Sequence, residues 1–372
     1  MLIYLLLPLV TLYCLFLSRA TIVKNNNMYN GEMFISRNRL TLFLWAAILL
    51  GLAAFKGVGV GTDYPMYYNF FLNKSYNDVE YGISFIYDVS IKYNNFLVFS
   101  FLIYFLFLFF IFQGIKKNCP NYLISILMFI FTYTYFTSYN QLRQMIAVSI
   151  IFCFVNYLIS NRKLIKIKYL VVILIALLFH NSAIFMFSLF FIPQKKFSVR
   201  IVVPLFLMTI ILYFIPEFKN QIGNIIVKLS GSYMEKYSTN LDFFFEVNKE
   251  KGLLQLIPVV IQMVIVSLSL CFPKNESGLN INAQIYNFST NLVVINLCLY
   301  SLAGIEAIDR LQIYFSCFNI YFYSILIHLL LNTKKQLYGQ VFIVFIVTFW
   351  ILYYVLRLIT NISGVVPYSF FN

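Results

Sequence analysis

Long apolar runs, separated by short basic or polar segments, fill most of the chain. Runs of about 20 apolar residues are long enough to cross a bilayer as helices, and these runs are continuous, without the alternation of a barrel strand. The pattern predicts spans near residues 1–18, 40–55, 95–113, 121–138, 143–160, 201–216, 253–271, 283–303, 311–331 and 339–357. We therefore expect an all-α polytopic integral membrane protein with about ten full transmembrane helices, forming a single transmembrane domain over residues 1–372.

The run at 169–193, "YLVVILIALLFHNSAIFMFSLFFIP", is a special case because basic residues flank both of its ends. A single span would invert the orientation of every later loop. Two half-helices broken at "HNS", each about 17 Å long, return the chain to the side it came from. Such a broken hairpin needs a tip buried in protein or wetted by a cavity. We favour the hairpin, which places His180 deep in the membrane portion facing an outward cavity, and a single span remains the alternative.

Composition and charge agree with a membrane protein. The 372 residues are 61% hydrophobic and only 11% charged, whereas soluble domains carry about 25% charged residues. The net charge of +14 follows from lysines and arginines gathered in the loops predicted to face the cytosol, so no nucleic-acid partner is expected. The N-terminal run lacks a basic leader and a cleavage site and is interpreted as a retained first span. The six cysteines lie in apolar runs or at their ends, without CxxC spacing, and indicate neither a disulfide framework nor a metal site.

Two outer segments, 56–94 and 217–252, are longer than a connection requires and mix aromatic with charged residues. Such segments are typical of interfacial helices, and we expect these two to cap the site. The first contains "GVGVGTDYPMYYNFF", in which glycines permit a sharp turn just before Asp63. We interpret this turn as a hinge that aims Asp63 at a substrate, and a solvated aspartate at a helix end is the alternative.

Ionisable residues near the membrane are costly, so each is a candidate for function. Glu80 in "VEYGISF" and Asp88, eight positions later, can share one helical face, and both can also be ordinary interfacial acids. His180 at the expected helix break is either a proton acceptor or a satisfied core residue. His328, in "SILIHLLLN", is interpreted as structural.

Two arginines begin predicted spans at the outer side. Arg143 lies in "SYNQLRQMIAVSI" beside Asn140 and Gln144, a polar cluster at a helix start that suits an anion. Arginine can bind a phosphate with two parallel hydrogen bonds. A lone arginine near the end of a span can also extend its side chain to the membrane–water interface. Arg310, in "GIEAIDRLQIYF", is either a second phosphate contact or the partner of Glu306 in an i,i+4 ion pair.

Several familiar motifs are missing from the sequence. It contains no HExxH, GxSxG, P-loop or dinucleotide-binding glycine pattern, so no nucleotide-dependent chemistry is indicated on the inner side. No cluster has the spacing of metal ligands, and no cofactor or metal is expected.

Five short stretches occur in an order that resembles the EpsG-type polysaccharide polymerases, which are similar to the wider Wzy group of O-antigen and capsule polymerases. In patches, the resemblance covers essentially the whole chain. The stretches are "GVGVGTDYPMYY", "EYGISFIY", "YNQLRQMIAVSI", "FHNSAIF" and "GVVPYSFF". The acidic, arginine and histidine positions of the family fall on Asp63, Glu80, Arg143 and His180.

The resemblance implies a GT-C-like membrane glycosyltransferase of the bacterial inner membrane with a periplasmic active face. Its substrates would be undecaprenyl-diphosphate-linked repeat units, and a flippase and a chain-length regulator would be its partners. The expected roles are catalysis by Asp63, Glu80 or His180, diphosphate binding by Arg143, Arg310 and Gln144, and sugar binding by Tyr64 and Asn140. A glycan ligase, an O-acyltransferase and a flippase for lipid-linked sugars remain alternatives.

Overall fold

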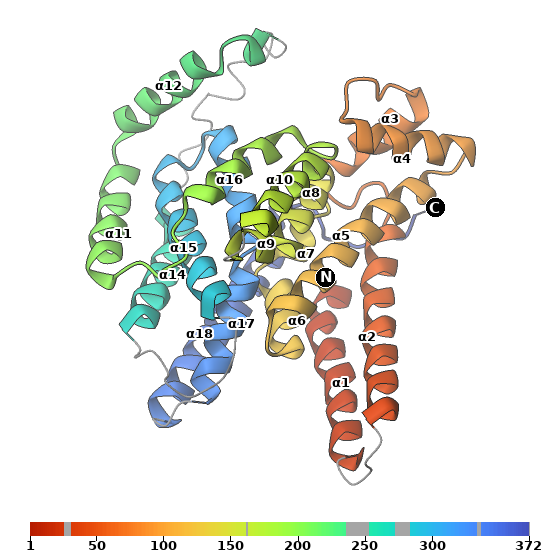
Figure 1. Cartoon of the computed structure of the whole chain (residues 1–372). Helices are drawn as coiled ribbons and strands as arrows, with labels where there is room; N and C mark the ends of the chain where they lie inside the picture. The colour runs from red at the N-terminus through yellow and green to blue at the C-terminus, as the bar shows by residue number, and fades with distance from the viewer. Residues whose placement is uncertain (26–30, 161–162, 236–252, 272–282, 333–335, 372) are drawn as a thin grey trace. The chain divides into compact units, whose positions relative to one another are not determined.

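The computed structural model describes residues 1–25, 31–160, 163–235, 253–271, 283–332 and 336–371, and within these ranges the chain is built from helices (Figure 1). It divides into two compact units, Met1–Met186 with Ile343–Asn372, and Phe187–Phe342. The prediction of one transmembrane domain stays a prediction.

The first unit holds the N-terminal half of the chain and most of the last helix. Its elements are α1 (Leu2–Asn25), α2 (Gly31–Ala54), α3 (Tyr64–Asn73), α4 (Tyr81–Lys92), α5 (Phe96–Asn118), α6 (Tyr122–Phe131), α7 (Thr134–Thr137), α8 (Leu142–Cys153), α9 (Val155–Ile159), α10 (Lys163–Leu177), the first half of the 3-10 helix η1 (Asn181–Phe191) and most of α18 (Gln336–Thr360).

The second unit holds the helices between η1 and α18. They are α11 (Val199–Tyr213), α12 (Pro216–Glu235), α14 (Leu253–Cys271), α15 (Ala283–Cys298), the 3-10 helix η3 (Leu299–Leu302), α16 (Glu306–Ser316) and α17 (Asn319–Leu331).

Each predicted span coincides with one helix or with two consecutive helices, and the all-helical class is confirmed for the described residues. Four helices there are long and apolar enough to cross a bilayer, or up to five if the pair α11 and α12, bent by 96°, is one span. Other predicted spans correspond to shorter apolar helices. The number of about ten full spans is therefore not confirmed.

Two predicted spans are interrupted. The run 121–138 turns after Thr132, whose hydroxyl donates to the Met128 carbonyl, and Tyr133 adopts a left-handed backbone with φ 66°. The run 143–160 leaves helical geometry at Phe154. Neither break contains a glycine or proline, the residues that usually indicate a helix break in a sequence.

The run 169–193 is broken, as favoured. The α-helix α10 ends at Leu177, and the chain resumes as η1 at Asn181. The break therefore lies at 178–180 and overlaps the expected "HNS" only at its first residue. Whether these two segments form a hairpin within the membrane stays a prediction.

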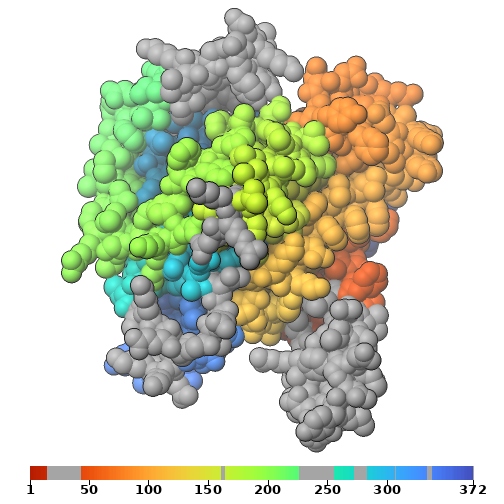
Figure 2. Space-filling model, in the orientation of Figure 1, coloured from red at the N-terminus to blue at the C-terminus, as the bar shows by residue number. Residues whose placement is uncertain are grey.

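The long segment 56–94 forms two short helices, α3 and α4, which lie at the surface of the first unit (orange in Figures 1 and 2). Ring stacking fixes α4 on α5: the ring centroids of Tyr87 and Phe99 are 4.1 Å apart, and both residues are fully buried. In the other long segment, α12 covers 216–235, and 236–252 lie outside the described residues.

Candidate functional site

The glycine-rich turn is held in place by the C-terminal segment. Gly57 N–H donates to the Ser369 carbonyl at 2.7 Å, and Gly61 N–H donates to the Gly364 carbonyl at 2.9 Å. Gly61 has φ 103°, a conformation that L side chains rarely adopt, and a Cβ there would lie 2.9 Å from the Tyr139 carbonyl oxygen. The turn therefore requires glycine at position 61 for both conformational and steric reasons.

Asn140 fastens the same turn to the start of α8. Its Oδ1 accepts a hydrogen bond from Thr62 N–H at 2.9 Å, and its Nδ2 donates to the Ser363 carbonyl at 3.0 Å. Three stretches that are far apart in sequence thus meet around one amide side chain, immediately next to the helix that carries Arg143.

Glu80 is positioned by the way α4 begins. It is the N-cap of α4, with extended backbone at φ −61° and ψ 146°. Two residues later, Gly82 N–H donates to the Leu178 carbonyl at 2.7 Å. A Cβ on Gly82 would lie 2.8 Å from that carbonyl oxygen and 3.1 Å from the Phe179 ring. The absence of a side chain at position 82 lets the start of α4 contact the break after α10 directly.

The substitution Gly82→Ala is expected to separate α4 from the α10 break. The added methyl group cannot fit 2.8 Å from a backbone oxygen, so the backbone must shift and the Gly82–Leu178 hydrogen bond is lost. We expect a destabilisation of about 1–3 kcal/mol, measured by thermal unfolding of the purified protein. Gly51→Ala in α2 is the matched control, because a methyl group at that position would meet no neighbouring segment within 4 Å. Equal melting temperatures for both variants would contradict this role for Gly82.

Glu80 lies between a guanidinium and an imidazole. Its Oε2 is 2.7 Å from Nη1 of Arg143 in the first turn of α8, and its Oε1 is 3.0 Å from Nδ1 of His180 at the break after α10. The same Oε1 accepts a hydrogen bond from Asn181 N–H at 3.3 Å. The side chains of Glu80, His180 and Arg143 are 6%, 10% and 25% exposed, so the cluster is largely shielded while its arginine retains access to solvent.

The protonation state of Glu80 follows from these contacts. Burial by itself raises the pKa of Glu80, but the hydrogen bond to His180 and the charge of Arg143 outweigh burial and lower the pKa to about 2. Glu80 is therefore a carboxylate near neutral pH and can only accept hydrogen bonds. Nδ1 of His180 must then carry the hydrogen that it shares with Glu80, which makes Nε2 the basic nitrogen of the neutral ring.

Comparison with known families identifies the family of the chain. The model of the EpsG family matches residues 39–370, which is most of the chain and includes all of the first four stretches noted above. The chain belongs to the EpsG family. This is the family of Wzy-like polysaccharide polymerases, so the expected resemblance is confirmed. No curated protein and no solved structure matches the chain.

In this EpsG-family protein the structure brings together three of the predicted site residues, Glu80, Arg143 and His180. Asp63 lies half-buried at the N-cap of α3, where its Oδ1 accepts a hydrogen bond from the Thr62 hydroxyl at 3.0 Å. Within the described part of the chain Asp63 has no ion-pair partner. Its role as a base or sugar ligand stays a prediction.

The other predicted contacts of this EpsG-family chain also stay predictions. The Tyr64 ring is fully buried and its hydroxyl donates to Ser100, while Asn140 holds the turn described above. Gln144 is buried in α8. Arg310 belongs to α16 in the second unit, and the side chain of Glu306, its expected partner, lies outside the described residues.

Sequence reasoning missed Tyr67. Tyr67 is 3% exposed, and its hydroxyl lies within hydrogen-bonding reach of Arg143. Its carbonyl accepts a hydrogen bond from the Tyr87 hydroxyl at 3.0 Å, which ties α3 to α4. Burial raises the pKa of Tyr67, although the charge of Arg143 opposes that rise. As one of 29 tyrosines, Tyr67 carried no signal of its own in the sequence.

Sequence reasoning also did not single out Lys56. It is fully buried beneath the glycine-rich turn, and its Nζ lies against the ring of Tyr64 and within 6 Å of the ring centroids of Tyr104 and Tyr139. In the described part of the chain this Nζ has no hydrogen-bond partner. Burial lowers the pKa of Lys56 well below its usual value.

Proposed function

We propose that this EpsG-family protein elongates a polysaccharide from undecaprenyl-diphosphate-linked repeat units at the outer face of the bacterial inner membrane. Family membership supports a polysaccharide polymerase. The observation that carries the proposal is the position of Glu80 between Arg143 and His180. This cluster pairs a candidate proton acceptor with a candidate ligand for phosphate, the two groups that transfer from a lipid diphosphate requires.

His180 serves as the general base in this proposal. A base is effective when a third group orients it, and Glu80 does this by accepting the Nδ1 hydrogen. The acceptor hydroxyl gives its proton to Nε2 as its oxygen forms a bond to the anomeric carbon of the donor sugar. The bond from that carbon to the diphosphate oxygen breaks, and undecaprenyl diphosphate leaves with the electron pair. Asp63 is the alternative base.

Arg143 supplies positive charge where the leaving diphosphate becomes more negative. In this proposal the resting cluster has one carboxylate, one guanidinium and a neutral imidazole, so that its net charge is zero. When His180 takes the proton, the cluster gains one positive charge at the moment the diphosphate departs. The Nε of Arg143 is buried and has no hydrogen-bond partner among the described residues. A buried donor left unsatisfied in a native structure calls for an explanation, and a catalytic role is one of them.

The substitution Arg143→Ala is expected to abolish long-chain polymer while the protein still inserts into the membrane. Removal of one donor to a developing anion typically lowers a rate by about 10²- to 10³-fold. The measurement is the length distribution of extracted glycan from cells that express each variant. Arg200→Ala, at an exposed arginine in α11, is the control. Polymer of normal length from the Arg143 variant would contradict the proposal.

The lipid-linked intermediates in the same cells separate the polymerase from its alternatives. A polymerase defect leaves single repeat units on the outer leaflet, whereas a flippase defect leaves them on the inner leaflet. A ligase defect leaves finished polymer on its lipid carrier, and an O-acyltransferase defect leaves chain length unchanged. Only the first pattern agrees with the proposed function.

A further inference from the structure

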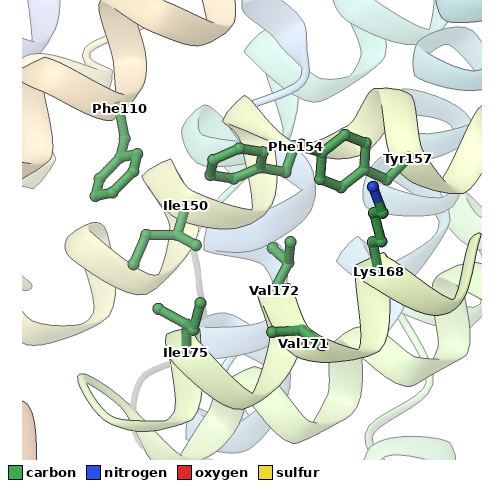
Figure 3. Close-up of a pocket in the computed structure, with 8 residues that line it drawn as sticks. All are labelled: Phe110, Ile150, Phe154, Tyr157, Lys168, Val171, Val172 and Ile175. Atoms are coloured by element: carbon green, nitrogen blue, oxygen red, sulfur yellow. The ribbon is translucent and has the colours of Figure 1, made fainter. Parts of the chain in front are cut away.

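A pocket of about 350 Å³ lies in the first unit, away from the Glu80 cluster. Its size is within the range of small-molecule sites, about 300–1,000 Å³. It lies between α5, the α8–α9 break and α10. Among its described lining residues only Lys168 carries a charge. The lining residues are Phe110, Ile150, Phe154, Tyr157, Lys168, Val171, Val172 and Ile175 (Figure 3).

Lys168 lines one end of this pocket with the carbon stem of its side chain. In Figure 3 the Lys168 side chain rises beside the Tyr157 ring, and Phe110 lies at the opposite end. The Tyr157 and Phe154 rings are neighbours, with centroids 5.5 Å apart. Nζ of Lys117, at the end of α5, lies 4.6 Å from the Phe154 ring centroid. Lysines from two different helices therefore each lie beside one of these two neighbouring rings.

The rest of the pocket is suited to a hydrocarbon chain. From Lys168 the lining follows α10 through Val171 and Val172 to Ile175, about 10 Å along the helix axis. Val171 and Ile175 are exposed on the outside of the first unit, whereas Val172 is buried. In a membrane-spanning protein an exposed apolar groove of this kind faces lipid.

The two lysines lie far from the proposed reaction site. Lys168 is in the second turn of α10, and His180 follows the C-terminal end of the same helix, so about 14 Å of helix separates them. Likewise, Arg143 begins α8, whereas Phe154 follows its end, a separation of about 16 Å. These distances are roughly half the hydrocarbon thickness of a bilayer. A substrate whose diphosphate contacts Arg143 cannot also place that group against Lys168.

We propose that this pocket binds an anionic phospholipid, with the lipid phosphate at Lys168 and Lys117 and one acyl chain along α10. The charge pattern supports this occupant, because Lys117 at the end of α5 and Lys168 near the start of α10 belong to basic segments predicted to face the cytosol. The cytoplasmic leaflet is rich in anionic lipids that attract such segments. The site is distinct from the substrate site and does not depend on the reaction assigned above.

Native mass spectrometry of the purified full-length protein tests the site. The protein is titrated with dioleoylphosphatidylglycerol, dioleoylphosphatidylcholine or undecaprenyl diphosphate. We expect phosphatidylglycerol to be retained over phosphatidylcholine. Lys168→Ala should lower that retention about fivefold, as expected for one lysine near an anionic headgroup, and Val171→Trp should lower it at least as much by filling the groove.

Two variants on the same helix are the controls. Lys166→Ala removes a neighbouring lysine, and Leu170→Trp adds a large ring at an exposed residue that does not line the pocket. Both should retain phosphatidylglycerol like the unmodified protein, and size-exclusion profiles confirm that all variants are folded. Equal retention by Val171→Trp and Leu170→Trp would overturn the site. If the protein retains undecaprenyl diphosphate and Val171→Trp abolishes that retention, the assignment of the pocket to a phospholipid is overturned. Neither outcome depends on polymerase activity.

Discussion

Glu80→Gln is expected to lower the rate of chain elongation by about 10²- to 10⁴-fold, the range for loss of an oriented acid–base group. An amide has no negative charge to balance Arg143. It also has only one oxygen in place of two, so it cannot accept hydrogen bonds from both Arg143 and His180 in the observed geometry. The measurement is the initial elongation rate of purified protein in nanodiscs, per amount of folded protein.

Asp88→Asn is the matched control for this prediction. Asp88 lies in α4, the helix that Glu80 caps, eight residues after Glu80, but it is exposed and accepts a hydrogen bond from the Tyr76 hydroxyl at 2.8 Å. The control makes the same chemical change without touching the cluster and should keep its activity. Removal of one partner from a shielded ion pair also destabilises a protein, so unfolding temperatures are compared as well. A folded Glu80 variant with unchanged activity would contradict the proposed site.

His180→Asn is expected to lower the elongation rate by a similar factor, about 10²- to 10⁴-fold, and to remove the acid limb of the pH profile. Asparagine can still donate a hydrogen bond to Glu80, but it has no nitrogen that accepts a proton. The pKa of Glu80 is lowered to about 2, so Glu80 stays ionised until the pH falls towards that value. A loss of rate between about pH 8 and pH 5 therefore reports protonation of a histidine.

His328→Asn serves as the control for the pH profile. His328 is the other histidine of the chain and lies in α17 of the second unit. Its variant should keep both the rate and the acid limb. If His180→Asn retains the acid limb, the base is a different group, and Asp63 would then be the residue to test.

The helices were largely predictable from the sequence, because the length and continuity of apolar runs determine them. The interruptions within the runs 121–138 and 143–160 were not, because Tyr133 and Phe154 are not residues that usually break helices. The break before Asn181 was predictable because three polar residues interrupt an otherwise apolar run. The position of the break differs by only a few residues from the expected one.

The members of the site were easier to predict than their pairing. Glu80, Arg143 and His180 each stood out as costly groups near the membrane, but no periodicity relates residues that are 63 and 100 positions apart. The interpretation that the glycine-rich turn aims Asp63 at a substrate remains untested. The structure shows what holds the turn in place: Gly61 is hydrogen-bonded to Gly364. Sequence reasoning could not relate two glycines so far apart.

The stretches that carry the family resemblance are the ones that meet in the first unit. "EYGISFIY" supplies Glu80 and Gly82, "YNQLRQMIAVSI" supplies Asn140 and Arg143, and "FHNSAIF" supplies His180. The remaining two, around Gly61 and Gly364, are hydrogen-bonded to each other, and Asn140 binds the first of them through Thr62. The five stretches therefore form one connected set of contacts.

Elongation by the isolated protein tests the central claim most directly. The purified chain is reconstituted in liposomes with a defined undecaprenyl-diphosphate-linked repeat unit, and the products are separated by size. A ladder of whole repeat units, with one undecaprenyl diphosphate released for each unit added, is the predicted result. A substrate that crosses the bilayer, or that is consumed without any ladder, would contradict the assignment of Glu80, Arg143 and His180 to a polymerase.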